Sequence, residues 1–275
     1  MAARHDGHEV GQIGTLANLG TTYFAMHDYD RAAETFTAAQ QLAAITGHLE
    51  EESACSHNLA ATHLSLGNVA RAIEIYEETL AVFRKLVNPA GEAATLYWLG
   101  HAYLLLGHHQ RSADIHLQSL AIRQRIGAKR GTGQSHGGLG TLHLACGRLR
   151  LAQHHCETAL AIHTQARDQR AVCDTLITLT EIRCGLHAWD DAVRSGQQAV
   201  RLSEEISDSY RQVRALTVLG DALSESGDAV SATHLIQAAE RILGQLSGIE
   251  VRRLREKLVA SRRAVRQLHP EPRAG

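Results

Sequence analysis

The chain has 275 residues, 44% of them hydrophobic and 21% charged, a balance typical of one large or two ordinary folded domains and not of a disordered chain. Its 28 basic and 29 acidic residues leave a formal net charge of -1, which excludes a global electrostatic attraction to nucleic acid or to an anionic membrane. We expect neither a secretion signal at residues 1–10 nor a membrane span, because the chain has no signal-like apolar core and no long uncharged apolar stretch.

Cysteine and histidine are placed in ways that argue against a metal site. The five cysteines form no C-x-x-C pair and lie inside apolar stretches, at Cys55, Cys146, Cys156, Cys173 and Cys184. This pattern indicates reduced core thiols in a cytoplasmic protein. The 18 histidines include no H-E-x-x-H motif and no pair spaced four residues apart. We therefore predict neither a metal nor a cofactor.

The composition favours helix over sheet. Proline occurs only at Pro89, Pro270 and Pro272, which leaves long segments free for helix. Aromatic residues make up 4% of the chain and runs of β-branched residues are sparse, whereas sheets are rich in both. We expect a nearly all-helical chain that begins after a flexible segment at residues 1–8.

Residues 9–247 contain six copies of one pattern, spaced 40 residues apart without an insertion. A leucine recurs at Leu19, Leu59, Leu99, Leu139, Leu179 and Leu219. The residue after it is Gly20, Ala60, Gly100, Gly140, Thr180 or Gly220. A fixed period of this length predicts a repeat architecture, with units at about 9–47, 48–87, 88–127, 128–167, 168–207 and 208–247.

Three further columns divide each unit into two helices. Seven residues after the small position there is a turn residue: His27, Gly67, Gly107, Gly147, His187 or Gly227. Glycine there suits the left-handed residue that ends a helix. The second helix carries a small column at Ala32, Ala72, Ser112, Ala152, Ala192 and Ala232. Ten residues later it carries an apolar column at Leu42, Val82, Ile122, Ile162, Leu202 and Ile242.

The small columns predict close helix packing. Two helix axes approach to about 8 Å only where a small side chain leaves room. One helix pair cannot bury its apolar face alone, so the pairs must stack. We therefore predict an all-α solenoid of six antiparallel helix hairpins.

The last segment, residues 249–268, breaks the 40-residue period. Its apolar residues Val251, Leu254, Leu258, Val265 and Leu268 form a helical stripe, and the remaining positions are rich in arginine. Because a solenoid needs a terminal cap with one polar face, we predict a capping helix here. Contact with nucleic acid is the less favoured interpretation, since no recognised reading motif accompanies the basic residues. Residues 269–275 are expected to form a flexible tail.

The repeated pattern resembles the tetratricopeptide repeat (TPR) family, whose units carry a Leu-Gly step and a following Tyr, Gly, Ala and aromatic residue. The first unit shows it at Leu16, Leu19, Gly20, Tyr23, Ala32, Phe36 and Ala39. In the third unit His116 stands where an aromatic residue is expected. The period of 40 departs from the usual 34. It is similar to the longer variant of kinesin light chains and of actinobacterial antibiotic-regulatory transcription factors. The resemblance implies a right-handed superhelix that binds peptides or proteins.

The stretch GTGQSHGGLG at residues 131–140 contains G-x-S-x-G, the pattern of the serine-hydrolase nucleophile elbow. In the repeat register Ser135 belongs to a column of small residues: Thr15, Cys55, Thr95, Ser135, Thr175 and Ala215. An elbow also needs a preceding strand, which this helical pattern does not provide. Each interior glycine costs about 1 kcal/mol relative to alanine, so this helix should be the least stable first helix of the six. Relaxed selection and a deliberately soft place in the groove both stay open as explanations.

The resemblance implies that the first helices of the pairs line a concave groove. The residue before each leucine would face it, and in long-repeat relatives an Asn there commonly binds the backbone of an extended peptide, because an amide is both donor and acceptor. Neighbouring positions on this face are aromatic in the N-terminal half and acidic in the C-terminal half. The predicted binding residues are Asn18, Thr21, His57, Asn58, Tyr97, Trp98, His101, Glu181 and Asp221.

These features predict a non-enzymatic protein- or peptide-binding module whose ligand has a basic end. The resemblance implies a role in bacterial signalling or transcriptional regulation, either as a free-standing protein or as part of a longer regulator. Two alternatives remain: a self-assembling scaffold, including a homodimer, and a serine hydrolase that uses Ser135. We predict no membrane partner and do not favour a nucleic acid.

Overall fold

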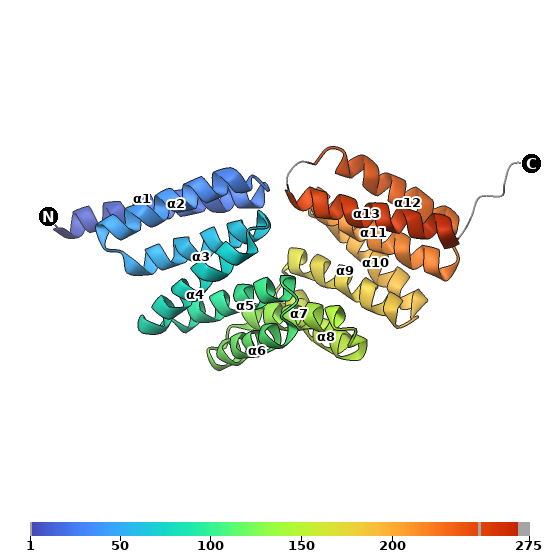
Figure 1. The fold of residues 1–275 in the computed structure, drawn as a ribbon, viewed down its shortest axis with the longest axis horizontal. Coiled ribbons are helices and arrows are strands. Elements are labelled where there is room, and N and C mark those ends of the chain that lie inside the picture. Colours follow the sequence, from blue (N-terminus) through green and yellow to red (C-terminus); the bar gives the residue numbers. More distant parts are fainter. Residues whose placement is uncertain (1, 247–248, 269–275) are drawn as a thin grey trace, which may run out of the picture. The chain divides into compact units, whose positions relative to one another are not determined.

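The computed structural model describes residues 2–246 and 249–268, and the regular structure in this part of the chain is helical (Figure 1). Six helices precede residue 126: α1 (Ala2–Ala25), α2 (Tyr29–Thr46), α3 (Leu49–Ser65), α4 (Val69–Lys85), α5 (Pro89–Leu105) and α6 (His109–Arg125). Six more follow: α7 (Lys129–Ala145), α8 (Leu149–Gln165), α9 (Gln169–Gly185), α10 (Trp189–Glu205), α11 (Ser209–Ser226) and α12 (Ala229–Leu243). The last described helix is α13 (Ile249–Leu268).

The helices are grouped into two compact units, residues 1–131 and 132–275, with the boundary inside α7. In unit 1 each helix from α1 to α6 packs on the next, and the first helices of successive pairs also touch, α1 on α3 and α3 on α5. In unit 2 the helices from α8 to α12 pack in the same consecutive way, and α9 touches α11. The predicted all-α architecture of stacked hairpins is confirmed within each unit.

The backbone has positive φ in the turns within helix pairs, as predicted, and also in the turns between pairs. All six predicted turn residues have positive φ, from 58° at His187 to 99° at Gly227, which confirms the left-handed conformation at that column. The turns that link one pair to the next use the same conformation at Gly47, Val87, Gly127, Arg167 and Ser207. This second set has no clear signal in the sequence, because Val and Arg rarely adopt positive φ.

The small column packs against the second helix of the same pair. A Cβ built on Gly20 would lie 2.7 Å from the Phe36 ring, and one built on Gly100 would lie 3.0 Å from the His116 ring. In the fifth pair the sizes are exchanged: Thr180 stands at the small position, and its hydroxyl bonds to that of Ser195, beside Gly196. The small column is therefore set by what the facing helix carries, as close packing requires.

The two ends of the described chain are both helical. Helix α1 begins at Ala2, so residues 2–8, where we expected a flexible segment, are helical in the structure. Alanine and arginine at residues 2–4 favour helix, and no proline interrupts them. Helix α13 packs on α11 and α12 through Leu254, Leu258 and Val265, all buried. The tail expected at residues 269–275 lies outside the described residues.

Candidate functional site

The predicted amide row lies on three adjacent helices of unit 1. Asn18 on α1, Asn58 on α3 and Trp98 on α5 occupy the same repeat position, and α3 touches both α1 and α5. Asn18 is exposed, whereas Asn58 and Trp98 are half-buried. Thr21, also exposed on α1, donates its hydroxyl hydrogen to the Ala17 carbonyl at 2.9 Å. The row therefore presents amide groups and one large aromatic ring at a partly accessible surface.

The aromatic part of this face forms one cluster on α5. The ring centroids of Tyr97 and Trp98 are 5.3 Å apart, and those of Trp98 and His101 are 6.0 Å apart. Both pairs are edge-to-face, at 76° and 84°, which is a favoured geometry for aromatic rings. All three residues are half-buried, so the cluster offers a fixed apolar wall. Such aromatic side chains supply much of the binding energy in protein interfaces.

His57 on α3 contacts α5, the helix that carries the aromatic cluster. Its Nδ1 lies 3.1 Å from the Thr95 hydroxyl, which links α3 to α5, and its ring lies 5.6 Å from that of Tyr76. Burial, and then the positive charge of Arg123, lower the pKa of His57 from 6.5 to about 4. A neutral imidazole that is already bonded to Thr95 acts as a positioning group more than as a contact for a ligand.

Two residues of α6, His116 and Arg123, contact Tyr97 and were not predicted as part of the site. The Arg123 guanidinium carbon lies 5.1 Å from the Tyr97 ring centroid, and Nη1 donates to the Gly131 carbonyl at 2.6 Å. His116 is fully buried, and neither of its ring nitrogens has a hydrogen-bond partner among the described residues. Burial, followed by the charges of His101 and Arg123, lowers the pKa of His116 to about 3. The only sequence signal was His116 at an aromatic position.

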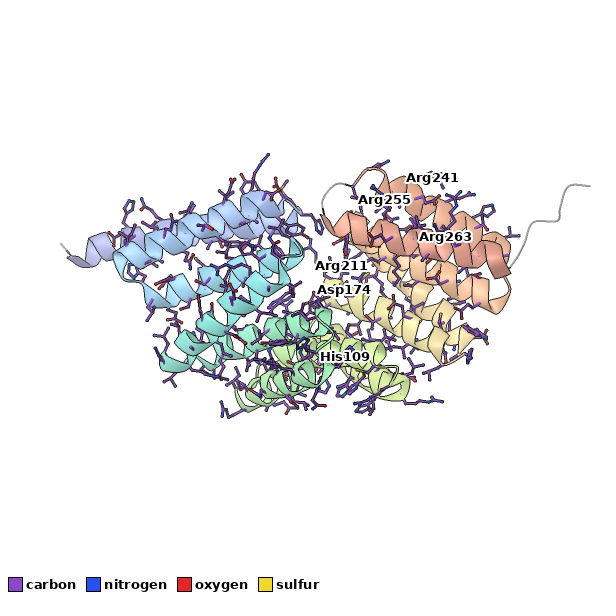
Figure 2. All side chains as sticks on the ribbon, in the orientation of Figure 1. His109, Asp174, Arg211, Arg241, Arg255 and Arg263 are labelled. Atoms are coloured by element: carbon purple, nitrogen blue, oxygen red, sulfur yellow. The ribbon has the colours of Figure 1, made fainter. Side chains whose placement is uncertain are left out.

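The acidic positions predicted for the C-terminal half of the groove, Glu181 and Asp221, lie in unit 2. Both have partners in the same unit. Glu181 on α9 is ion-paired with Lys257 on α13. Burial raises the pKa of Asp221, although a hydrogen bond with Ser261 on α13 and the nearby Lys257 oppose the shift. Another carboxylate of the same unit, Asp174 on α9, accepts hydrogen bonds from Arg211 at 2.7 Å and from Arg214 at 2.8 Å (Figure 2). The structure therefore pairs these groups with side chains of the same unit.

The G-x-S-x-G stretch lies within helix α7. Ser135 is completely buried, with 0% of its surface exposed, so a substrate has no access to its hydroxyl. His136 has its Nδ1 3.0 Å from Nδ1 of His155 on α8. Both observations agree with the predicted packing role of the serine column and leave the hydrolase alternative without a reachable nucleophile.

The described residues were also compared with the requirements of a small-molecule cavity, a metal site and a membrane span. A cavity of about 170 Å³ lies among α2, α3 and α4, and Gln40, Ser56 and Thr79 are in its wall. Among the described residues, no three side chains of metal-ligating type form a group that could hold an ion. No helix in the described part of the chain is long and apolar enough to span a bilayer.

Comparison with known proteins gave one family match and several shared folds. Residues 12–85 match the family model described as tetratricopeptide repeat. A Rap protein complexed with competence and sporulation factor aligns with a TM-score of 0.69 and 14% identity, over 92% of this chain and 76% of that one. The Rap conjugation gene regulator of plasmid pLS20, in complex with the Phr* peptide, aligns with a TM-score of 0.70 and 10% identity, over 98% of this chain and 79% of that one.

A third structure contains the nearly identical TPR-like repeats of a kinesin light chain from Podosopora anserina. It aligns with a TM-score of 0.56 and 20% identity, over 69% of this chain and 93% of that one. None of the curated protein sequences matches this chain. At these identities the solved structures show a shared fold. Residues 12–85 thus match the tetratricopeptide repeat in sequence, and the chain shares its fold with these repeat proteins.

Proposed function

We propose that unit 1 binds an extended peptide, or an extended segment of a partner protein, along the row of Asn18, Asn58 and Trp98. The observation that carries the proposal is the placement of two amides at one repeat position on touching helices, with the aromatic wall on the next. An amide side chain can donate to a backbone carbonyl and accept from a backbone N–H, so it binds a peptide independently of its sequence. Tyr97 and Trp98 would then hold an apolar side chain of the ligand.

The structural neighbours support this proposal. Two Rap proteins are seen in complex with competence and sporulation factor and with the Phr* peptide, and the fold of this chain aligns with both. The role in bacterial signalling or transcriptional regulation that the sequence resemblance implied belongs to the same proposal. We confine the site to unit 1, because Glu181 and Asp221 have contacts with α13.

The test begins with peptides selected against the wild-type chain from a random displayed library. The double variant Asn18→Ala, Asn58→Ala should bind the selected peptides about thirtyfold more weakly, since each lost hydrogen bond contributes about 1 kcal/mol. Trp98→Ala should weaken binding further by removing the apolar wall. Fluorescence anisotropy of labelled peptides measures both effects.

A matched control is Asn68→Ala. Asn68 is exposed in the same unit, at the start of α4, and its side chain makes no capping hydrogen bond. Its replacement should leave affinity unchanged. Equal affinity of the wild type and of the Asn18, Asn58 double variant would contradict the proposed site.

A further inference from the structure

One face of α1 is uncovered although its counterparts in all later repeats are buried. Leu19 is 43% exposed, whereas the other five leucines of its column are at most 8% exposed. Thr15 and Thr22 are exposed too, and the later residues of their columns are buried: Cys55, Thr95, Ser135, Thr175 and Ala215, and Thr62, Ala102, Leu142, Ile182 and Ala222. Thr15, Leu19 and Thr22 lie on one side of the helix, at steps of four and three. The repeat pattern therefore places a helix-packing surface on α1 that nothing described covers.

A hole at Gly11 belongs to the same face. Glycine also stands at the equivalent positions 91 and 131, where a Cβ would meet Phe83 at 2.6 Å and Arg123 at 2.9 Å, both from the preceding helix. At Gly11 a Cβ would meet nothing within 4 Å. A groove of about 530 Å³ lies here, lined by His8, Gly11, Gln12, Thr15, Leu16 and Leu42. Its repeat counterparts show that the groove is shaped for a large side chain from another helix.

The face carries no charge. Residues 10–27 contain no Asp, Glu, Lys or Arg, whereas the equivalent helix α3 has three glutamates in its first turn. An uncharged helix face does not select an oppositely charged partner, and two copies of it meet without repulsion. This property suits self-association.

We propose that a second copy of this chain covers the face, with the two α1 helices packed antiparallel about a two-fold axis near Thr15. In that arrangement Leu19 of each copy enters the hole at Gly11 of the other, because residues 11 and 19 are equally spaced from Thr15. Gly11, Thr15 and Leu19 form a ridge at steps of four, the commonest ridge in helix packing. A two-fold interface needs such a self-complementary surface.

The opposite end of the repeats favours this symmetric arrangement over head-to-tail stacking. Stacking would require an open last helix pair, but α13 packs on both α11 and α12 and buries Leu254 and Leu258 against them. One helix face of about 28 Å, from residues 8–26, makes an interface at the small end of specific contacts. We therefore expect a dimer that dissociates at micromolar concentrations.

Sedimentation velocity of the whole chain, from about 1 μM to about 500 μM, tests the proposal because mass action shifts a weak dimer over that range. Wild-type protein should change from monomer to dimer. Gly11→Leu should stay monomeric, because its own side chain fills the hole, yet it should fold normally since the space there is open. Leu19→Arg should also raise the dissociation constant at least about a hundredfold, because two-fold symmetry counts each change twice.

The matched control is Leu117→Arg on α6, where the leucine is 52% exposed and therefore as accessible as Leu19. This variant should dimerise like the wild type, and circular dichroism should show native helix content in all variants. A wild-type chain that stays monomeric at every concentration would overturn the proposal and leave the face to a helix of another protein. A dimer that persists in both Gly11→Leu and Leu19→Arg would overturn it as well.

Discussion

The glycines of α7 act differently although they lie a few residues apart. A Cβ at Gly140 would collide with the Cys156 sulfur, and one at Gly133 would lie 2.8 Å from the His163 ring. A Cβ at Gly137 would meet nothing within 4 Å. Close packing thus accounts for Gly133 and Gly140, which corrects the idea that the whole glycine-rich stretch reflects relaxed selection. Gly137 is the position where glycine brings no packing benefit.

The residue-scale prediction compares two substitutions in this one helix. Gly137→Ala should raise the free energy of unfolding by about 0.5–1 kcal/mol through helix propensity. Gly140→Ala should lower it by about 1–3 kcal/mol, because Cys156 and α8 must shift. Urea unfolding followed by circular dichroism measures both values. A stabilising Gly140→Ala would contradict the close packing of Gly140 on Cys156, and a destabilising Gly137→Ala would contradict the open space at Gly137.

At the scale of helix pairs, α7 and α8 are joined by neutral histidines. His155 lies with its ring stacked 5.4 Å from His143, and its Nδ1 faces that of His136. Burial, and then the charges of His136, His143 and His154, lower the pKa of His155 from 6.5 to about 4. The folded pair therefore holds its rings in the uncharged form. The sequence pattern does not predict this contact, since His136 and His155 are 19 residues apart in the chain.

This arrangement predicts loss of stability in acid. Because the unfolded chain binds the proton at about pH 6.5 and the folded chain only near pH 4, the contribution of His155 is complete above pH 6.5 and declines as the pH falls to 4. His155→Gln should reduce the pH slope of the unfolding free energy by up to about 1.4 kcal/mol per pH unit, the value for one proton. Urea unfolding at a series of pH values checks this. His109→Gln replaces an exposed histidine of α6 outside this cluster and serves as the matched control (Figure 2).

At the scale of the whole molecule, stability is expected to depend on neighbouring helix pairs. Repeat proteins have contacts between adjacent units and few between distant ones, so a change at one end affects that end first. In unit 2 the end is closed by α13, whose Leu258 is 1% exposed and belongs to one core cluster with Val213 and Ile236. The capping helix thus contributes packing to α11 and α12 in addition to the ion pair with Glu181.

Leu258→Ala should accordingly destabilise unit 2 by about 2–4 kcal/mol, the usual effect of a buried leucine truncation. Hydrogen exchange should become faster in α11, α12 and α13 and stay unchanged in α1 to α4. Val259→Ala, at a 43% exposed position of the same helix, should have an effect within about 0.5 kcal/mol. Uniformly faster exchange along the chain would contradict nearest-neighbour stability.

The helix pairs, their 40-residue period and the left-handed turns at His27 and Gly67 follow from the amino-acid sequence alone. These features depend on residues close together in the chain, and six copies repeat the same signal. By contrast, the side chain that fills each space depends on tertiary packing: His116 against Gly100, Arg123 against Tyr97, and Lys257 beside Glu181. The exposure of Leu19 also could not be predicted from the sequence, because all six repeats carry leucine at this position. Such contacts depend on how one helix pair stacks on the next, and the period of the pattern does not specify that geometry.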